Sequence, residues 1–215
     1  MSVYFPKNLD DFGVILKGAS VARLPQVSDS FDHCYMVNNF DRNVNNEDSE
    51  YSIVAPELNG KQIVHFVNRL NTAPLLPEHY KELDIQNIQF TKCELDHMIL
   101  GMKRLYESYG LKCHMLPEEL LGYNDFFQGV GNYAKKHPNT GALAIIYAAH
   151  MLKPKNLWVV GLDFYQNDYL FRRPWQAPLK QQKAKMDRTN MVEHFIDVVK
   201  RNPDVNFKMI TNAQL

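Results

Sequence analysis

Residues 157–167 read LWVVGLDFYQN, a short apolar run that ends in a glycine and continues into a polar turn. Such a run, with two valines and no charged residue, is typical of a strand that is buried on both faces of a sheet. The flanking segments differ, because residues 140–152 and about 180–201 place apolar side chains at the spacing of one helix face. A strand between two helices is typical of the βαβ unit of a parallel sheet.

The same alternation of strand-like and helix-like segments extends along the rest of the chain. Residues 95–109 and 117–136 have helical spacing, the pair Asn139-Thr140 is a fair N-cap for the helix that follows it, and the polar segment 43–50 predicts a solvated loop. Six further apolar runs predict strands at 14–17, 33–37, 62–67, 88–90, 112–115 and 207–210. We therefore expect an α/β fold in which residues 1–215 form a single domain, with one doubly wound, mostly parallel sheet and helices on both faces.

The composition excludes several classes of function. Lys plus Arg number 24 and Asp plus Glu also number 24, so no net field attracts nucleic acid or an anionic membrane. No apolar run approaches the roughly 18 residues of a membrane span, and the beginning of the chain lacks the pattern of a secretion signal. Three cysteines without CxxC spacing favour reduced thiols over a disulfide framework or a zinc site. We expect a cytoplasmic protein without a nucleic-acid partner or a membrane span, and the sequence leaves homo-oligomerisation open.

Small and amide-bearing residues follow the predicted strands or begin the predicted helix at 140–152. In an open parallel sheet, ligands bind beyond the carboxyl ends of the strands, and backbone N–H groups at turns and helix starts receive anions. These residues are Gly18, Ser20, Asn38, Asn68, Thr140 and Gly141. Together they predict a site for a phosphate-bearing ligand, although each one alone is also typical of an ordinary turn. Because neither GxGxxG after the first strand nor GxxxxGK[ST] is present, an ordinary dinucleotide fold and a P-loop are disfavoured.

The turn after the quoted strand carries further candidate groups. Gly161 and Asp163 come directly after this strand, and Tyr165 and Tyr169 follow, four residues apart. The two phenols can each donate a hydrogen bond to one leaving phosphate, and the alternative is a half-buried ring with a solvated hydroxyl. Asp163 has no second carboxylate in a DxD arrangement, so hydrogen bonds from loop N–H groups are favoured over a metal at this residue.

The segment DFYQN at 163–167 resembles a motif of the bacterial lipooligosaccharide sialyltransferases, where a strand ending in G-[IL]-D-F-Y-Q-N precedes a second tyrosine. The resemblance extends in collinear order from about residue 13 to residue 210. The other matching segments are GVILKGAS at 13–20, YMVNNF at 35–40, HFVN at 65–68, LGYNDFF at 121–127 and NTG at 139–141. The chain is thus similar to this family over most of its length.

The resemblance implies a variant glycosyltransferase A-type fold and the transfer of sialic acid or a related sugar from a CMP-activated donor. It also implies inversion at the anomeric carbon without a metal or cofactor, with a nucleotide-sugar donor and a glycan acceptor as the partners. The donor-binding residues that it implies, together with those of the strand ends, are Gly18, Ser20, Asn38, Asn68, Thr140, Gly141, Gly161 and Asp163. Tyr165 and Tyr169 would stabilise the departing phosphate, for which neutral hydrogen-bond donors suffice because a nucleotide monophosphate is already a good leaving group.

The chain departs from this family at two places. Lys17 and Ala19 stand where the first turn of the family has asparagine and proline, and Lys17 can still meet a phosphate as a point charge. The segment that matches the family's catalytic base, residues 183–190, contains no histidine, and its side chain suited to act as a base at neutral pH is Asp187. His137 is the second candidate for the base.

The alternatives to a sialyltransferase are a related nucleotide-binding transferase or diphosphokinase, and a nucleotide-sugar-binding module without catalysis.

Overall fold

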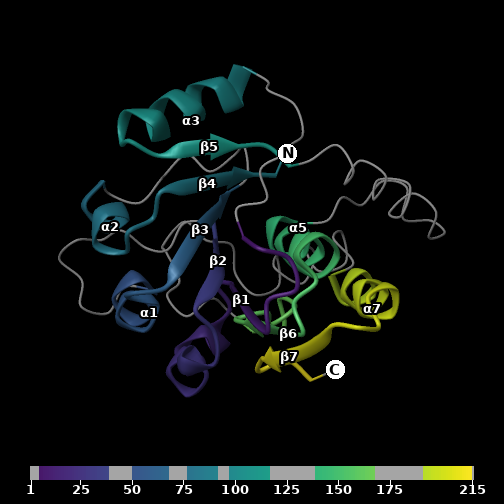
Figure 1. Cartoon of the computed structure of the whole chain (residues 1–215). Helices are drawn as coiled ribbons and strands as arrows, with labels where there is room; N and C mark the ends of the chain where they lie inside the picture. The colour runs from purple at the N-terminus through teal and green to yellow at the C-terminus, as the bar shows by residue number, and fades with distance from the viewer. Residues whose placement is uncertain are drawn as a thin grey trace.

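A single sheet of seven strands organises the chain in the computed structural model, which describes residues 5–38, 50–67, 77–91, 97–116, 139–167 and 191–214. The strand order is β5-β4-β3-β2-β1-β6-β7, and each strand pairs in parallel with its neighbours (Figure 1). The strands are β1 (Asp11–Ile15), β2 (His33–Val37), β3 (Gln62–Val67), β4 (Asn87–Phe90), β5 (Lys112–His114), β6 (Asn156–Val160) and β7 (Asn206–Ile210). The chain builds outward from β1 to β5 and then crosses to the other side of β1, so the strand order reverses between β1 and β6.

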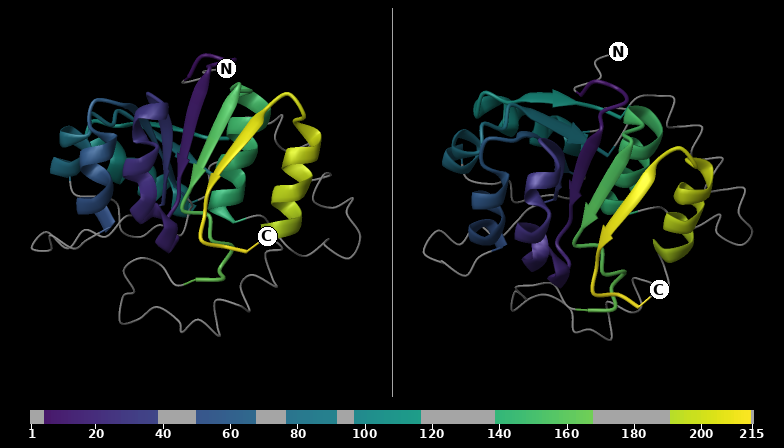
Figure 2. Two further views of the ribbon diagram at one scale, coloured as in Figure 1. Left: turned by 90° about the horizontal axis from the view of Figure 1, so that it is seen from below. Right: turned by 60° about the horizontal axis from the view of Figure 1, so that its bottom comes forward.

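Helices cover both faces of this sheet (Figures 1 and 2). One face carries the 3-10 helices η1 (Ala19–Gln26) and η2 (Ser28–Ser30), α1 (Glu50–Leu58), α2 (Pro77–Glu82) and α3 (His97–Ser108). The other face carries α5 (Thr140–Tyr147), its continuation as the π-helical turn η5 (Ala148–Leu152), and α7 (Met191–Arg201). This is the doubly wound α/β fold that the alternation of segments predicts. Among the described residues, no helix has the length and apolar character needed to cross a membrane.

The core forms two apolar layers because side chains along each strand alternate between the faces of the sheet. In β2, Tyr35 packs in the layer of α5 and α7, whereas Cys34 and Met36 belong to the layer of α1, α2 and α3. The Tyr35 ring makes edge-to-face contacts with Phe12 and Phe66, with ring centroids 5.0 and 5.2 Å away. Aromatic pairs of this kind add about 0.5–1.5 kcal/mol beyond the burial of their area. Packing on both faces fixes the strands, and with them the turns at their carboxyl ends.

The structure confirms all seven predicted strands, with ends shifted by at most three residues. It also confirms the predicted helices that correspond to α3 and α5, and α7 is the described part of the predicted helix at 180–201. The predicted helix at 117–136 lies outside the described residues. The sequence analysis did not predict η1, α1 or α2. Glu50, expected to end a polar loop, instead begins α1, because the residues that follow it bury Val54 and Leu58 against the sheet.

Gly13 and Gly101 are test positions with opposite surroundings. A Cβ atom added at Gly13 in β1 would lie 2.6 Å from a ring carbon of the buried Phe31, whereas one added at Gly101 in α3 meets nothing within 4 Å. We expect Gly13→Ala to lower the free energy of unfolding by about 1–3 kcal/mol through overpacking. Gly101→Ala should raise it by about 0.5–1 kcal/mol, because alanine favours the helix. Urea unfolding followed by circular dichroism measures both changes, and two variants of equal stability would contradict this packing.

Candidate functional site

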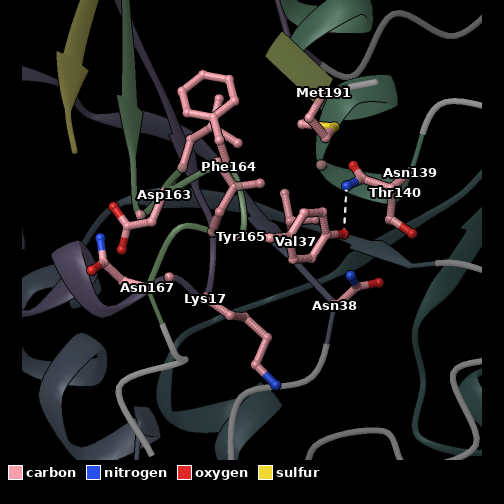
Figure 3. Close-up of a pocket in the computed structure, with 15 residues that line it drawn as sticks. Lys17, Val37, Asn38, Asn139, Thr140, Asp163, Phe164, Tyr165, Asn167 and Met191 are labelled. Atoms are coloured by element: carbon pink, nitrogen blue, oxygen red, sulfur yellow. Dashed lines mark hydrogen bonds between the residues drawn. The ribbon is translucent and has the colours of Figure 1, made fainter. Parts of the chain in front are cut away.

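A pocket of about 240 Å³ lies where the strand order reverses, at the carboxyl ends of β1 and β6. Open parallel sheets bind ligands at such a reversal. In Figure 2 the arrows of β1, β6 and β7 end at this edge of the sheet. The strand ends and the starts of α5 and α7 supply the lining (Figure 3), which consists of Leu16, Lys17, Gly18, Val37, Asn38, Asn139, Thr140, Gly141, Gly161, Leu162, Asp163, Phe164, Tyr165, Asn167 and Met191.

The turns around the pocket are joined by the carboxylate of Asp163, which is buried. This carboxylate accepts hydrogen bonds from the backbone N–H of Ser20 at 2.9 Å, from the Ser20 hydroxyl at 2.5 Å and from the backbone N–H of Asn212 at 2.9 Å. Hydrogen bonds to an ionised group contribute about 1.5–3 kcal/mol each. The bonds from loop N–H groups that the sequence favours for Asp163 are therefore present, and they connect the turns that follow β1, β6 and β7.

Two glycines allow the turns after β1 and β6 to approach each other closely. The backbone N–H of Gly18 donates to the carbonyl of Gly161 at 2.9 Å, and a Cβ atom at Gly18 would lie 2.5 Å from that oxygen. Gly161 has a φ angle of +81°, and a Cβ atom there would lie 2.4 Å from the carbonyl oxygen of Leu16. Because both obstacles are backbone atoms, a larger residue at either position would push the turns apart.

Asn38 ends β2 in the left-handed conformation, with a φ angle of +63°. Its backbone N–H donates to the carbonyl of Phe66 at 2.7 Å, and its own carbonyl accepts from Nε2 of His65 at 2.5 Å. Nδ1 of His65 lies 2.9 Å from the hydroxyl of Tyr80, so a neutral ring protonated at Nε2 satisfies both contacts. Burial lowers the pKa of His65 to about 4, which keeps the ring neutral at pH 7. The side-chain oxygen of Asn38 is buried and, within the described ranges, accepts no hydrogen bond.

Tyr165 lines the pocket from the turn after β6, where Phe164 and Tyr165 have φ angles of +49° and +60°. Left-handed backbone is uncommon for bulky residues and costs on the order of 1–3 kcal/mol, so neighbouring groups must hold it. The ring of Phe164 is buried against Phe195, and the hydroxyl of Tyr165 accepts a hydrogen bond from Nδ2 of Asn139 at 2.7 Å (Figure 3). Burial raises the pKa of Tyr165, and the bond from Asn139 opposes this rise. The phenol is therefore neutral at pH 7 and keeps a hydrogen to donate.

The start of α5 borders the same pocket. Asn139 is the N-cap of this helix, as predicted, because its side-chain oxygen accepts from the backbone N–H of Ala142 at 2.9 Å. A Cβ atom at Gly141 would lie 2.3 Å from a methyl carbon of Leu16, so the glycine lets α5 pack close to the end of β1. The partial positive charge of a helix start favours an anion in this pocket, which Lys17 also lines.

Seven of the predicted site residues line this one pocket, although they come from four separate segments of the chain. They are Gly18, Asn38, Thr140, Gly141, Gly161, Asp163 and Tyr165. Ser20 lies behind the lining and is fully buried, so its contact with a ligand stays a prediction. The remaining candidates lie outside the described residues, and their roles also stay predictions; they are Asn68, Tyr169, Asp187 and His137.

The sequence analysis did not assign Asn167 or Met191 to the site, and it did not find the hydrogen bond between Asn139 and Tyr165. Asn167 belongs to the DFYQN segment, which is the sequence signal that could have placed it. Met191 begins α7, and no sequence pattern brings that helix start to the ends of β1 and β6.

In the part of the chain that the structure describes, no group of three or more His, Cys, Asp and Glu side chains is placed to hold a metal ion. Metal independence therefore stays a prediction.

No family model and no curated protein sequence matches this chain, but solved structures do. The sialyltransferase CstII from Campylobacter jejuni, in complex with the substrate analogue CMP-3FNeuAc, is 16% identical with a TM-score of 0.57, covering 94% of this chain and 81% of that chain. The monofunctional alpha-2,3-sialyltransferase Cst-I from Campylobacter jejuni is also 16% identical with a TM-score of 0.57, covering 100% and 81%. CST-II in complex with a trisaccharide acceptor and CMP has a TM-score of 0.55 at 16% identity, covering 93% and 80%. The chain has the fold of these sialyltransferases.

Replacing Asp163 by asparagine tests whether its carboxylate joins the three turns. In the variant, the NH₂ group of the amide takes the place of one carboxylate oxygen and faces an N–H or O–H donor of Ser20 or Asn212. At least one hydrogen bond is therefore lost, and the free energy of unfolding should fall by about 2 kcal/mol or more. Asp11→Asn is the matched control, because Asp11 accepts from the indole N–H of Trp158 at 2.8 Å through one oxygen, and asparagine keeps an oxygen for this bond. Urea unfolding measures both variants. Equal stability of Asp163→Asn and Asp11→Asn would show that the carboxylate does not hold the turns.

The buried ring of His65 predicts a loss of stability in mild acid. Its folded pKa of about 4 lies below the value of about 6.5 in the unfolded chain, so the unfolded state takes up the proton first as the pH falls. The contribution of the neutral His65 ring to the free energy of unfolding is fully present above pH 6.5. It is lost as the pH falls toward 4, which lowers the free energy of unfolding by about 3 kcal/mol. His65→Gln keeps a donor for the Asn38 carbonyl and should reduce this loss, whereas His97→Gln, at an exposed position of α3, should not. Urea unfolding curves at pH 7 and pH 4.5 measure this loss in the unchanged protein and in the two variants. The same loss in all three proteins would show that His65 is not the group responsible.

Proposed function

We propose that the chain is a glycosyltransferase that transfers sialic acid or a related sugar from a CMP-activated donor to a hydroxyl group of a glycan. The observation that carries this proposal is the position of Tyr165. Its hydroxyl lies in the pocket where the strand order of a sialyltransferase fold reverses, and Lys17 and the start of α5 line the same pocket. The sialyltransferases of this fold include CST-II in complex with CMP and CstII in complex with CMP-3FNeuAc. The DFYQN resemblance supports the same donor.

The chemistry of the pocket suits the phosphate of such a donor. Lys17 and the start of α5 supply positive potential, and the hydroxyl of Tyr165 supplies a neutral hydrogen-bond donor. Gly18 keeps the turn after β1 close to the turn after β6, since a Cβ atom there would lie 2.5 Å from the carbonyl oxygen of Gly161. The buried side-chain oxygen of Asn38 needs a donor, which a hydroxyl or amino group of the nucleotide-sugar would provide.

The transfer step would place new negative charge on the phosphate. An oxygen of the acceptor hydroxyl would bond to the anomeric carbon from one side while the bond from that carbon to the phosphate oxygen breaks on the other, with inversion. CMP would leave with the electron pair of the broken bond. We assign to Tyr165 a hydrogen bond to the departing phosphate, and to Tyr169 a second one. Donors placed where charge develops lower the barrier because their bonds strengthen in the transition state.

The proton of the acceptor hydroxyl must pass to a base within hydrogen-bond reach. Asp163 lines the pocket but already accepts three hydrogen bonds from Ser20 and Asn212, so we do not assign this role to it. We propose Asp187 as the base, because an aspartate with its ordinary pKa near 4 is ionised at neutral pH and can accept a proton. Neither cofactor nor metal enters this scheme.

A nucleotide-sugar-binding module without catalysis is the second candidate. The observation that favours it is the absence of a histidine between residues 183 and 190, where the resembled family has its base. Such a module would bind the same donor in the same pocket and differ in turnover alone. Release of CMP from CMP-sialic acid, which an enzyme of this class would cause and a module would not, separates the two candidates.

The nucleotide that raises the melting temperature tests the proposed donor. We expect CMP and CDP to raise it more than UDP, GDP or NAD, because a ligand that binds the native state alone stabilises it, by about 2.7 kcal/mol at one hundred times its Kd. Differential scanning fluorimetry measures the shifts, and adding EDTA should leave them unchanged. Equal shifts from all five nucleotides would contradict a CMP-activated donor, and a CMP shift that depends on a divalent metal would contradict metal-independent binding.

A further inference from the structure

Asn139 makes two hydrogen bonds at once, and the first of them fixes the orientation of its amide. The side-chain oxygen accepts from the backbone N–H of Ala142 at 2.9 Å, as the N-cap of α5. A backbone N–H can only donate, so this end of the amide must be the oxygen and the other end must be the NH₂ group. The capping bond therefore determines that Nδ2 faces Tyr165.

The second bond then determines what the Tyr165 hydroxyl can do. Nδ2 of Asn139 lies 2.7 Å from the phenol oxygen, and an amide NH₂ group donates but does not accept. The phenol oxygen must accept from Asn139, so its own hydrogen points away from Asn139. In Figure 3 the free side of this hydroxyl faces the part of the pocket lined by Asn38 and Thr140. The hydrogen of Tyr165 is thereby aimed at the space that a ligand would fill.

We infer that Asn139 is a positioning residue that holds the Tyr165 hydroxyl as a donor into the pocket, and this inference rests on the proposed function of that pocket. The backbone supports it, because Phe164 and Tyr165 both have left-handed φ angles and the ring of Tyr165 is not placed by ordinary turn geometry. The bond from Asn139 also increases the donor strength of the phenol, since donation to the oxygen favours negative charge there. Asn139 thus couples the start of α5 to the group that would meet the departing phosphate.

Two substitutions separate this role from helix capping. Asparagine, aspartate and serine are all good N-caps, so Asn139→Asp and Asn139→Ser should keep most of the stability of the protein. Serine removes the donor to Tyr165. Aspartate replaces the donor by an acceptor, so the Tyr165 hydrogen would turn from the pocket toward residue 139. Asn59→Asp adds the same charge at an exposed position at the end of α1 and is the matched control.

A double-mutant cycle with Tyr165→Phe measures the coupling between the two side chains. We expect Asn139→Asp to lower kcat for release of CMP from CMP-sialic acid by about tenfold or more, and Asn139→Ser to lower it less. In the Tyr165→Phe background, Asn139→Asp should have little further effect, because the hydroxyl that it misdirects is already absent. Independent, multiplying losses would show that Asn139 acts through helix capping or general structure, and would overturn the inference.

Titration of Tyr165 keeps the inference testable if the protein releases no CMP. Tyrosine labelled with ¹³C at Cζ gives one signal per residue, and the Tyr165 signal is identified by its loss in Tyr165→Phe. Because the bond from Asn139 opposes the rise in the pKa of Tyr165 caused by burial, both Asn139 variants should shift this titration to higher pH, while Asn59→Asp should not. A shift without turnover would reject the transferase and keep the positioning role. An unchanged titration in both Asn139 variants would overturn the positioning role itself.

Discussion

The buried carboxylate of Asp163 connects the carboxyl ends of three strands of the sheet. Its oxygens accept from the backbone and hydroxyl of Ser20 after β1 and from the backbone of Asn212 after β7, while Asp163 itself follows β6. A buried charge is stable when hydrogen bonds replace the water that it has lost. The carboxylate therefore sets the relative positions of the turns on which the pocket depends.

Close approach of these turns then determines which residues the pocket can have. Gly18 and Gly161 leave no room for a Cβ atom, because the carbonyl oxygens of Gly161 and Leu16 lie 2.5 and 2.4 Å from where those atoms would stand. Among the described residues, the side chains that reach the pocket are neutral or cationic, apart from Asp163, whose oxygens are largely occupied. Such a lining suits a phosphate ester, and it suits a reaction in which charge moves onto that phosphate.

Much of this arrangement could be predicted from the sequence, because short apolar runs and helix periodicity are local signals. The seven strands, the cap at Asn139 and the structural bonds of Asp163 all follow from such signals. The helices α1 and α2 were missed because they are short, and α1 contains Pro56 within its apolar pattern. The left-handed backbone at Asn38, Phe164 and Tyr165 could not be predicted either. Tertiary contacts hold it, such as the bond from Asn139 to Tyr165 across 26 residues of sequence, and no local pattern encodes them.

The position of bound CMP tests the account most directly. A crystal structure of the protein with CMP should show the nucleotide at the carboxyl ends of β1 and β6, with a phosphate oxygen within hydrogen-bond distance of the Tyr165 hydroxyl and the bond from Asn139 intact. The same structure would show whether the buried oxygen of Asn38 gains a donor from the ligand. CMP bound elsewhere, for example in the cavity between α1 and α2 lined by Tyr51 and Glu82, would contradict the central claim that this pocket is the donor site.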